Sequence, residues 1–223
     1  MAIDLSNTDL SNLDLAGLDF KAANLTNANL FGVDLTDANL KSANLAGAKL
    51  DRAILMRSDF SGANLERATL MAPSIFSDAN FDRSEVPRFR NANLKSTRIA
   101  ARMDGSDFRG ADLTGARIGP QEPTMEAGMA PSSGMAGIDF TGATLVNADI
   151  RDVDFTFARF TGANLSGAKL LRVNLTNADL SGADFTDADL SGSNLDGANL
   201  AGVKGFDTVR GLDTVRHLDK AER

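Results

Sequence analysis

A large apolar residue recurs at every fifth position through most of this sequence. The series runs from Leu5 to Leu70 with fourteen members, and again from Phe140 to Leu200 with thirteen members. The residue two places earlier is usually Ala, Val or Ser, and the residue just before is usually Asn or Asp. Because self-similarity at a fixed period is the signature of a repeat architecture, this period constrains the fold more than any other feature.

A period of five fits neither common secondary structure. Five residues of an α-helix rotate by roughly 140° beyond a full turn, and five residues of a flat strand reverse the face each time. A coil that bends once per five residues sends every large residue and every Ala inward. Burying one Leu contributes roughly 1.5–3 kcal/mol, whereas ordering five residues of backbone costs roughly 5–10 kcal/mol. A lone repeat therefore does not fold, and the pattern predicts stacked coils around a shared core.

The individual repeats read ANLTN, ANLFG and VDLTD from Ala23, and ANLSG, AKLLR and VNLTN from Ala163. This pattern resembles the pentapeptide-repeat family, whose consensus is A(D/N)LXX, over about residues 3–205. The resemblance implies an all-β fold, a right-handed quadrilateral β-helix with four pentapeptides per coil. About 36 repeats would then make about nine coils. Phe20, Leu40 and Phe60 would share one inner row, which Phe81 continues after a one-residue shift. The Asn/Asp position is expected to satisfy turn amides rather than bind a ligand.

The regular pattern breaks in two places. Between the two series the phase shifts near Pro73 and Pro87, where we expect bulges rather than a domain boundary. Residues 119–137 then form an inserted loop that holds three of the five prolines and no basic residue. Its Met125, Met129 and Met135 offer adaptable apolar contacts. Two interpretations stay open for this loop: a flexible excursion that packs loosely on the rod, or a docking loop for a partner.

The last residues, 206–223, leave the period and read FDTVRG, LDTVRH, LDKAER. Asp after each apolar start is a good N-cap, and Gly211 is a good stop, so we expect a short helical cap on the 1–205 β-helix domain. The candidate residues for covering the last coil are Phe206, Val209, Leu212, Val215 and Leu218. The same apolar face would also serve a homodimer, and the two roles are compatible.

Charge is placed unevenly along the chain. The net charge is −7, which argues against direct binding of nucleic acid through its phosphates. The irregular middle is nevertheless basic, and the candidate partner-binding residues there are Arg88, Arg90, Arg98 and Arg102. The alternative is a solvated surface without a role. The outward apolar residues Phe31, Met56, Val146, Phe157 and Leu171 fall on different corners and form no obvious patch.

The chain offers no catalytic constellation. It has no Cys and a single His, His217, so thiolate chemistry, Cys-based zinc sites and a His-rich metal centre are excluded, and we expect no cofactor and no enzyme. No apolar run is long enough to cross a membrane, and no signal segment is evident, so we expect a cytoplasmic protein.

Two functions remain after catalysis is set aside. The first is a non-catalytic scaffold that binds a protein partner through its rod surface and inserted loop. The alternative rests on the family resemblance, because its Qnr-type and mycobacterial fluoroquinolone-resistance members look like DNA and act on DNA gyrase. It is a DNA-mimicking modulator of gyrase, and the basic middle of this chain departs from that pattern.

Overall fold

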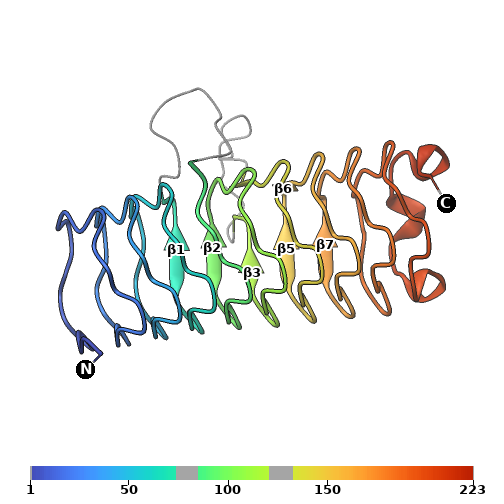
Figure 1. Ribbon diagram of the computed structural model, residues 1–223. Coiled ribbons are helices and arrows are strands. Elements are labelled where there is room, and N and C mark those ends of the chain that lie inside the picture. The colour runs from blue at the N-terminus through green and yellow to red at the C-terminus, as the bar shows by residue number, and fades with distance from the viewer. Residues whose placement is uncertain (1, 74–84, 121–132, 223) are drawn as a thin grey trace.

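The computed structural model describes residues 2–73, 85–120 and 133–222. The chain winds into a rod of stacked four-sided coils, with its two termini at opposite ends (Figure 1). In the regular stretches, residues twenty apart pair as parallel bridges, as Asp4 does with Asn24 and Asn24 with Asn44. Four pentapeptides therefore make one coil, as the family resemblance implies.

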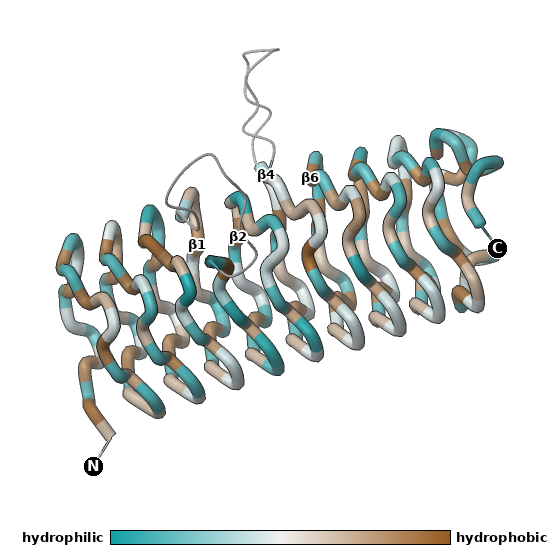
Figure 2. Tube along the Cα trace, turned by 45° about the horizontal axis from the view of Figure 1, so that its top comes forward, coloured by the Kyte–Doolittle hydropathy of each residue, from teal (hydrophilic) through white to brown (hydrophobic). Residues whose placement is uncertain are grey.

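Each coil has four sides, which we number in chain order from the first coil. Their ladders begin at Asp4, Asp9, Asp14 and Asp19. The second side carries a five-stranded parallel sheet of short strands, which are β1 (Thr69–Met71), β2 (Arg98–Ala100), β3 (Arg117–Ile118), β5 (Asp149–Arg151) and β7 (Lys169–Leu171). The third side carries the pair β4 (Ser133–Gly134) and β6 (Val153–Asp154). Hydrophilic and hydrophobic residues alternate along the chain around each coil (Figure 2).

The core is filled by the large residue of each repeat and by the small residue two places earlier. Leu45 and Ala43, for example, are both fully buried. On the fourth side the core residues include an aromatic column. Phe60 stacks on Phe89 at 4.9 Å, and Phe89 stacks on Phe108 at 4.6 Å between ring centroids. Phe140 continues the column at 5.3 Å from Phe108, and Phe160 follows at 5.1 Å from Phe140.

The sequence assigned the next position of this column to Phe81, which lies outside the described residues. The structure places Phe89 against Phe60 instead. The reason is that the chain adds residues between these two coils. The residue that stacks on Phe60 is therefore not the one that continues the sequence period. Asp59, which precedes Phe60, pairs with Arg88, which precedes Phe89.

The corners of the coils need a left-handed residue. In the first corner, the N–H of Thr8 donates to the carbonyl of Leu5 at 3.3 Å and closes a four-residue turn. Its third residue, Asn7, has φ 56°, a conformation that Gly, Asn and Asp tolerate best. The carboxylate of Asp4 accepts the N–H of Ser6 at 3.0 Å. The same contact recurs along the rod, which confirms the structural role predicted for the Asn/Asp position.

The breaks in the pattern are changes in the length of single coils. The ladder step is 29 residues from Asp59 to Arg88, 19 from Arg88 to Asp107 and 32 from Asp107 to Asp139. We expected bulges near the two prolines, but the first break instead adds nine residues to a coil, and the ladder continues across it. The inserted loop is also shorter than expected, because β4 has already rejoined the third side at Ser133.

The C-terminal coil is built from six-residue units. Each unit starts with a 3₁₀ turn: η1 (Phe206–Thr208), η2 (Leu212–Thr214) and η3 (Leu218–Lys220). The parallel ladder continues through Lys204, Arg210, Arg216 and Glu222. The extra residue per side is therefore accommodated at the corner, and the coil stays in register with the one before it. No helix within the described residues is long and apolar enough to cross a membrane.

Candidate partner-binding face

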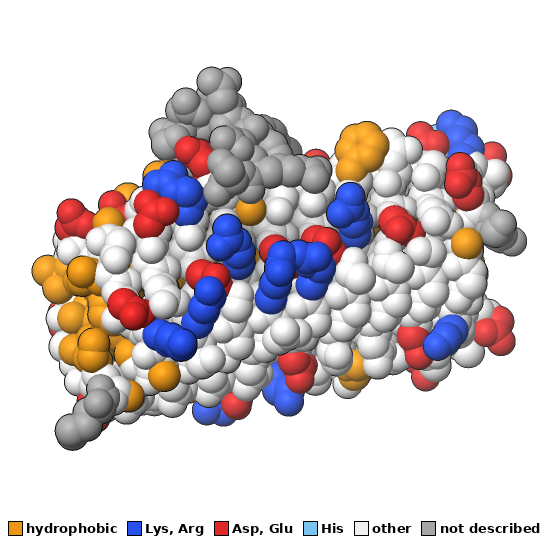
Figure 3. All heavy atoms as spheres, in the orientation of Figure 1, with side chains coloured by type: hydrophobic (Ala, Val, Ile, Leu, Met, Phe, Trp, Pro, Cys, Tyr) orange, Lys and Arg blue, Asp and Glu red, His pale blue; other side chains and the backbone are white. Residues whose placement is uncertain are grey.

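The fourth side carries a row of cationic side chains on four of the six coils from Asn39 to Arg159. They occupy the positions just before and just after the buried core residue, so the pleat directs them outward. Figure 3 shows Lys and Arg side chains crossing the middle of the face turned to the viewer. We call this group the arginine stripe, and it consists of Lys41, Arg88, Arg90, Arg109 and Arg159.

Three carboxylates lie between the cations on the same side and hold them in place. The side chains of Asp59, Asp107 and Asp139 are only 13–18 % exposed, whereas the cations are 44–60 % exposed. Lys41 and Arg88 approach Asp59 at 3.2 and 3.6 Å. The more exposed groups of the face are therefore positive, although each cation has an anionic partner beside it.

Asp107 is the centre of this network. Arg109 donates two hydrogen bonds to it, at 2.9 Å from Nε and 2.8 Å from Nη2, and Arg90 donates a third from Nε. Partial burial by itself raises the pKa of Asp107, but the bonds from Arg109 and Arg90 outweigh it, so the pKa lies below the ordinary value of 3.8. The carboxylate therefore stays charged at neutral pH and keeps the two guanidinium groups oriented.

Asp59 behaves in the same way two coils away. Burial raises its pKa, while hydrogen bonds from Ser61 and the Lys41 ammonium lower it, with a net lowering. Asp139 links the stripe toward the C-terminal half, because Arg109 and Arg159 both lie 3.8 Å from it. The ion pairs of the stripe thus form two clusters rather than a set of independent surface charges: one joins Lys41, Asp59 and Arg88, and the other joins Arg90, Asp107, Arg109, Asp139 and Arg159.

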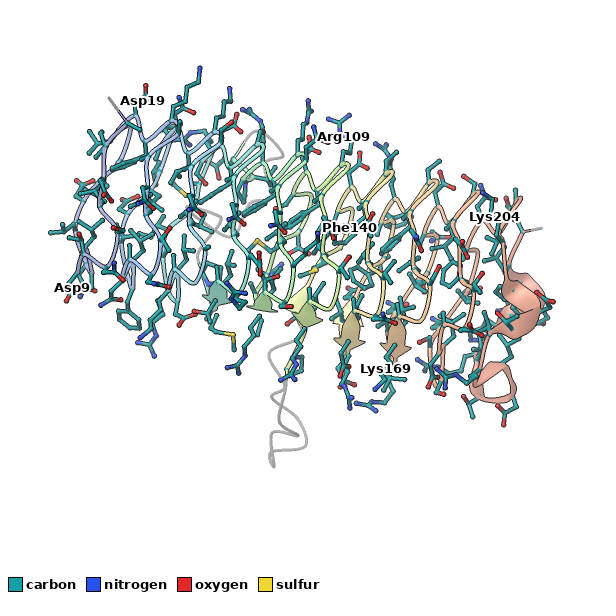
Figure 4. The ribbon with its side chains drawn as sticks, turned by 90° about the horizontal axis from the view of Figure 1, so that it is seen from below. Asp9, Asp19, Arg109, Phe140, Lys169 and Lys204 are labelled. Carbon is teal, nitrogen blue, oxygen red and sulfur yellow. The ribbon has the colours of Figure 1, made fainter. Side chains whose placement is uncertain are left out.

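The structure separates the four arginines that the sequence singled out. Arg88 and Arg90 belong to the stripe. Arg98 lies in β2 on the second side, which Figure 4 shows on the edge opposite Arg109. Arg102 lies on the third side, where it pairs with Asp104 at 2.9 Å. Sequence position alone therefore does not place these residues on one surface.

The sequence prediction left three residues of the stripe out of the candidate set: Lys41, Arg109 and Arg159. The repeat alone could have indicated two of them, because Lys41 and Arg159 flank Leu40 and Phe160, which are core positions of the fourth side. Arg109 could not be found this way, since its register depends on the changed length of two preceding coils.

The remaining candidates also separate. Met125 and Met129 lie outside the described residues. Met135 is fully buried and belongs to the core of the third side, so its side chain does not contribute to a surface for docking. At the C-terminal end, Val209 is buried, while Phe206, Leu212, Val215 and Leu218 are partly buried against the core. In the described ranges, no cluster of His, Asp and Glu could hold a metal ion.

A protein-family comparison matches the regular stretches of the chain. The model described as pentapeptide repeats matches residues 2–37, 34–71, 135–170 and 168–204. The chain belongs to the pentapeptide-repeat family. No curated protein matches its sequence.

Several solved structures are similar to the chain. HetL, a pentapeptide repeat protein involved in heterocyst differentiation regulation from the cyanobacterium Nostoc sp. strain PCC 7120, is 24 % identical, with 99 % of this chain and 89 % of that chain covered and a TM-score of 0.34. A trypsin-treated variant of QnrB1, a plasmid-mediated fluoroquinolone resistance protein, is 19 % identical, with 97 % and 91 % covered and a TM-score of 0.48. A pentapeptide repeat protein from the Arabidopsis thaliana thylakoid lumen is 32 % identical, with 52 % and 68 % covered and a TM-score of 0.31.

Proposed function

We propose that this pentapeptide-repeat protein is a non-catalytic scaffold that binds an acidic segment of a protein partner on its fourth side. The observation that carries the proposal is the arginine stripe, a row of half-exposed cations oriented by nearly buried carboxylates. Because the carboxylates already hold the guanidinium groups in place, little side-chain entropy is lost when a partner docks.

The mixed charge of the face favours a polypeptide over a nucleic acid. Five cations alternate with three carboxylates along the stripe. A phosphate backbone presents negative charge without interruption and would meet Asp59, Asp107 and Asp139 as well as the arginines. A protein surface can place its carboxylates opposite the cations alone, which gives register and specificity.

The inserted loop is the second element of the proposed site. On its C-terminal side the chain is described again from Ser133, in β4 on the third side, which adjoins the fourth side. We include Met125 and Met129, which lie outside the described residues, as adaptable apolar contacts for the partner. The polar stripe would then set the register of the partner, and the loop would add buried apolar area.

We also propose that the C-terminal coil is a cap on a right-handed β-helix. Leu190 and Leu195, in the coil before it, are fully buried. Side chains of the 3₁₀ corners accept hydrogen bonds from backbone N–H groups of that coil. The Oγ atoms of Thr208 and Thr214 accept the N–H groups of Asp187 and Gly192 at 2.8 and 2.9 Å. The last coil thereby covers the core and accepts hydrogen bonds from backbone N–H groups of the coil before it.

Affinity capture with two matched variants tests the scaffold function. The stripe variant carries Arg88→Gln, Arg90→Gln and Arg109→Gln, and the control variant carries Arg98→Gln, Arg117→Gln and Lys169→Gln on the second side. We expect the wild type and the control to capture a protein from the lysate that the stripe variant does not capture. Equal recovery by all three proteins, each checked for an unchanged thermal melt, would show that the partner does not bind this face.

A loop-deleted variant locates the second element. It replaces residues 119–137 by a short linker. Because residues 133–137 belong to the third side, a second variant that deletes only residues 121–132 serves as the control. Loss of the captured partner in the narrower deletion supports the loop as a contact. Full retention would leave the stripe as the whole site and remove the loop from the proposal.

DNA gyrase remains the alternative partner. A mimic of duplex DNA needs acidic groups along one face, but Asp179, Asp184 and Asp189 lie on the fourth, first and second sides. A supercoiling assay separates the two functions. Altered gyrase activity or quinolone sensitivity at micromolar protein would favour the alternative, and unchanged activity would remove it.

A further inference from the structure

The N-terminal end of the rod exposes apolar residues. Ile3, Leu13 and Leu18 are 46–49 % exposed, and they make up three of the five exposed large hydrophobic residues of the described chain. They occupy the position two before the core residue, where the second coil carries smaller residues such as Ala23 and Val33. Apolar side chains gather at this end of the rod, at the left of Figure 3.

An acidic ring surrounds this apolar end. On all four sides the ladder position of the first coil is an aspartate, and all four aspartates are exposed: Asp4, Asp9, Asp14 and Asp19. The second coil carries Asn at three of these four positions. An apolar centre with a polar rim is the usual anatomy of a protein interface. The charge of the rim then decides which partner surface fits.

A basic ring occupies the same ladder positions at the other end. Lys204, Arg210 and Arg216 pair with the coil before them on the first, second and third sides, and all three are exposed. Partly buried Phe206, Leu212 and Leu218 lie inside this ring. Figure 4 labels Asp9 and Lys204 at opposite ends of the rod. The two ends therefore differ in charge but match in side and in ladder position.

We infer that the N-terminal end of one molecule docks on the C-terminal end of a second copy. Continuing the ladder across the junction places Asp4 beyond Lys204, Asp9 beyond Arg210 and Asp14 beyond Arg216. On the fourth side Asp19 meets Glu222, so three attractive pairs stand against one repulsive pair. The exposed apolar residues of the first coil are covered by those of the last coil.

A docking of two N-terminal ends is disfavoured by charge. It would bring two aspartate rings together, and like charges at an interface cost affinity. The head-to-tail arrangement uses different surfaces on the two molecules and does not close on itself, so it propagates into open chains of molecules. Because the pairs are exposed, salt weakens the association.

Charge-swapped variants test this contact by sedimentation velocity over a range of protein concentrations in low salt. The first variant carries Asp9→Lys and Asp14→Lys, which cancels the net negative charge of the N-terminal ring and places lysines opposite Arg210 and Arg216. The second carries Arg210→Glu and Arg216→Glu, which makes both ends acidic. The matched control carries Arg98→Glu and Lys169→Glu on the middle of the second side. Circular dichroism and thermal melts check that each variant is folded.

We expect the wild type and the control to form larger species as concentration rises, and to lose them in high salt. Each swapped variant alone should sediment as a monomer, and an equimolar mixture of the two should associate again. Restored association is the decisive result, because unfolding or general loss of solubility cannot produce it. Three results would each overturn the proposal: a wild type that is monomeric at every concentration, association of the second variant on its own, or a mixture that stays monomeric.

Discussion

At the scale of single residues, position within the repeat decides what a side chain does. Phe157 and Phe155 are two residues apart, yet Phe157 is 62 % exposed and Phe155 is fully buried. The residue at the core position is predictable from the period of five alone. Which residues stack on one another is not, since Phe89 became the neighbour of Phe60 only through a coil of changed length.

Removing a ring from the middle of the aromatic column should destabilise the fold strongly. Phe108 is buried and contacts the rings on both sides, at 4.6 Å from Phe89 and 5.3 Å from Phe140. Phe108→Ala leaves a cavity and loses both contacts, so we expect a loss of about 3–5 kcal/mol in the free energy of unfolding. Urea titration measures it, with Phe157→Ala as the control, which should change stability by less than about 0.5 kcal/mol. Equal effects of the two substitutions would contradict the assignment of Phe108 to the core.

Glycine is required for space at one position and only for conformation at others. Gly119 has φ 100°, and a Cβ there would lie 2.0 Å from the carbonyl oxygen of Arg151, whereas a Cβ at Gly142, with φ 64°, meets nothing within 4 Å. Gly142→Ala should cost about 1–2 kcal/mol, the usual strain of a left-handed L-residue. Gly119→Ala should cost clearly more, because backbone must move. Thermal unfolding of the two variants compares them, and a smaller loss for Gly119→Ala would count against the close packing of these coils.

At the scale of the element, the unit is a coil that tolerates changes of length. The sequence predicted the coil and its four sides through the period and the family resemblance. It did not predict how the chain passes through the breaks, because the same residues can be added as a bulge or as an excursion. The six-residue period of FDTVRG and LDTVRH carried a signal that was missed. The fifth residue of these units, Arg210 and Arg216, holds the ladder position, so the ladder could have been expected to continue.

Asp104 secures the coil where the inserted loop rejoins the rod. Its side chain is nearly buried, and it accepts the N–H of Ala136 at 2.8 Å and Arg102 Nε at 3.1 Å. Asp104→Ala leaves the amide of Ala136 without this acceptor, so we expect a loss of about 1–3 kcal/mol. Amide hydrogen exchange should accelerate around Ala136 more than in the first coils. Uniform acceleration along the rod would show that Asp104 does not act locally.

At the scale of the whole molecule, surface charge is a property of sides rather than of sequence segments. The basic middle of the sequence contributes Arg88 and Arg90 to the fourth side, but Arg98 to the second and Arg102 to the third. Net charge and its uneven distribution along the chain were predictable. The arginine stripe was not, because its members are brought together by ladder steps of 29, 19 and 32 residues.

Acid should destabilise the rod as a whole. Asp107, Asp149 and Asp179 all have pKa values below the ordinary 3.8. For Asp149 the main cause is the hydrogen bond from Arg151, and for Asp179 bonds from Ser181 and Thr161 outweigh a burial that by itself raises the pKa. The unfolded chain therefore binds protons at a higher pH than the folded rod does. The stabilisation is complete above the ordinary pKa and is lost as pH falls below about 3.8 through the folded values.

Urea midpoints between pH 6 and pH 2 measure this effect, and they should fall steeply only in the lower part of the range. In Asp107→Asn the acid-dependent loss should be smaller than in the wild type, because one of the shifted carboxylates is gone. A midpoint that rises on acidification would contradict the ion-pair network of the fourth side.

The most direct test of the central claim is a binding titration of the wild type, the stripe variant and the second-side control with poly-L-glutamate at low ionic strength. If the fourth side recognises acidic polypeptide, the wild type and the control bind with similar affinity, binding weakens as salt rises, and the stripe variant loses binding. Equal affinity of the stripe variant, or loss of binding only in the control, would contradict it.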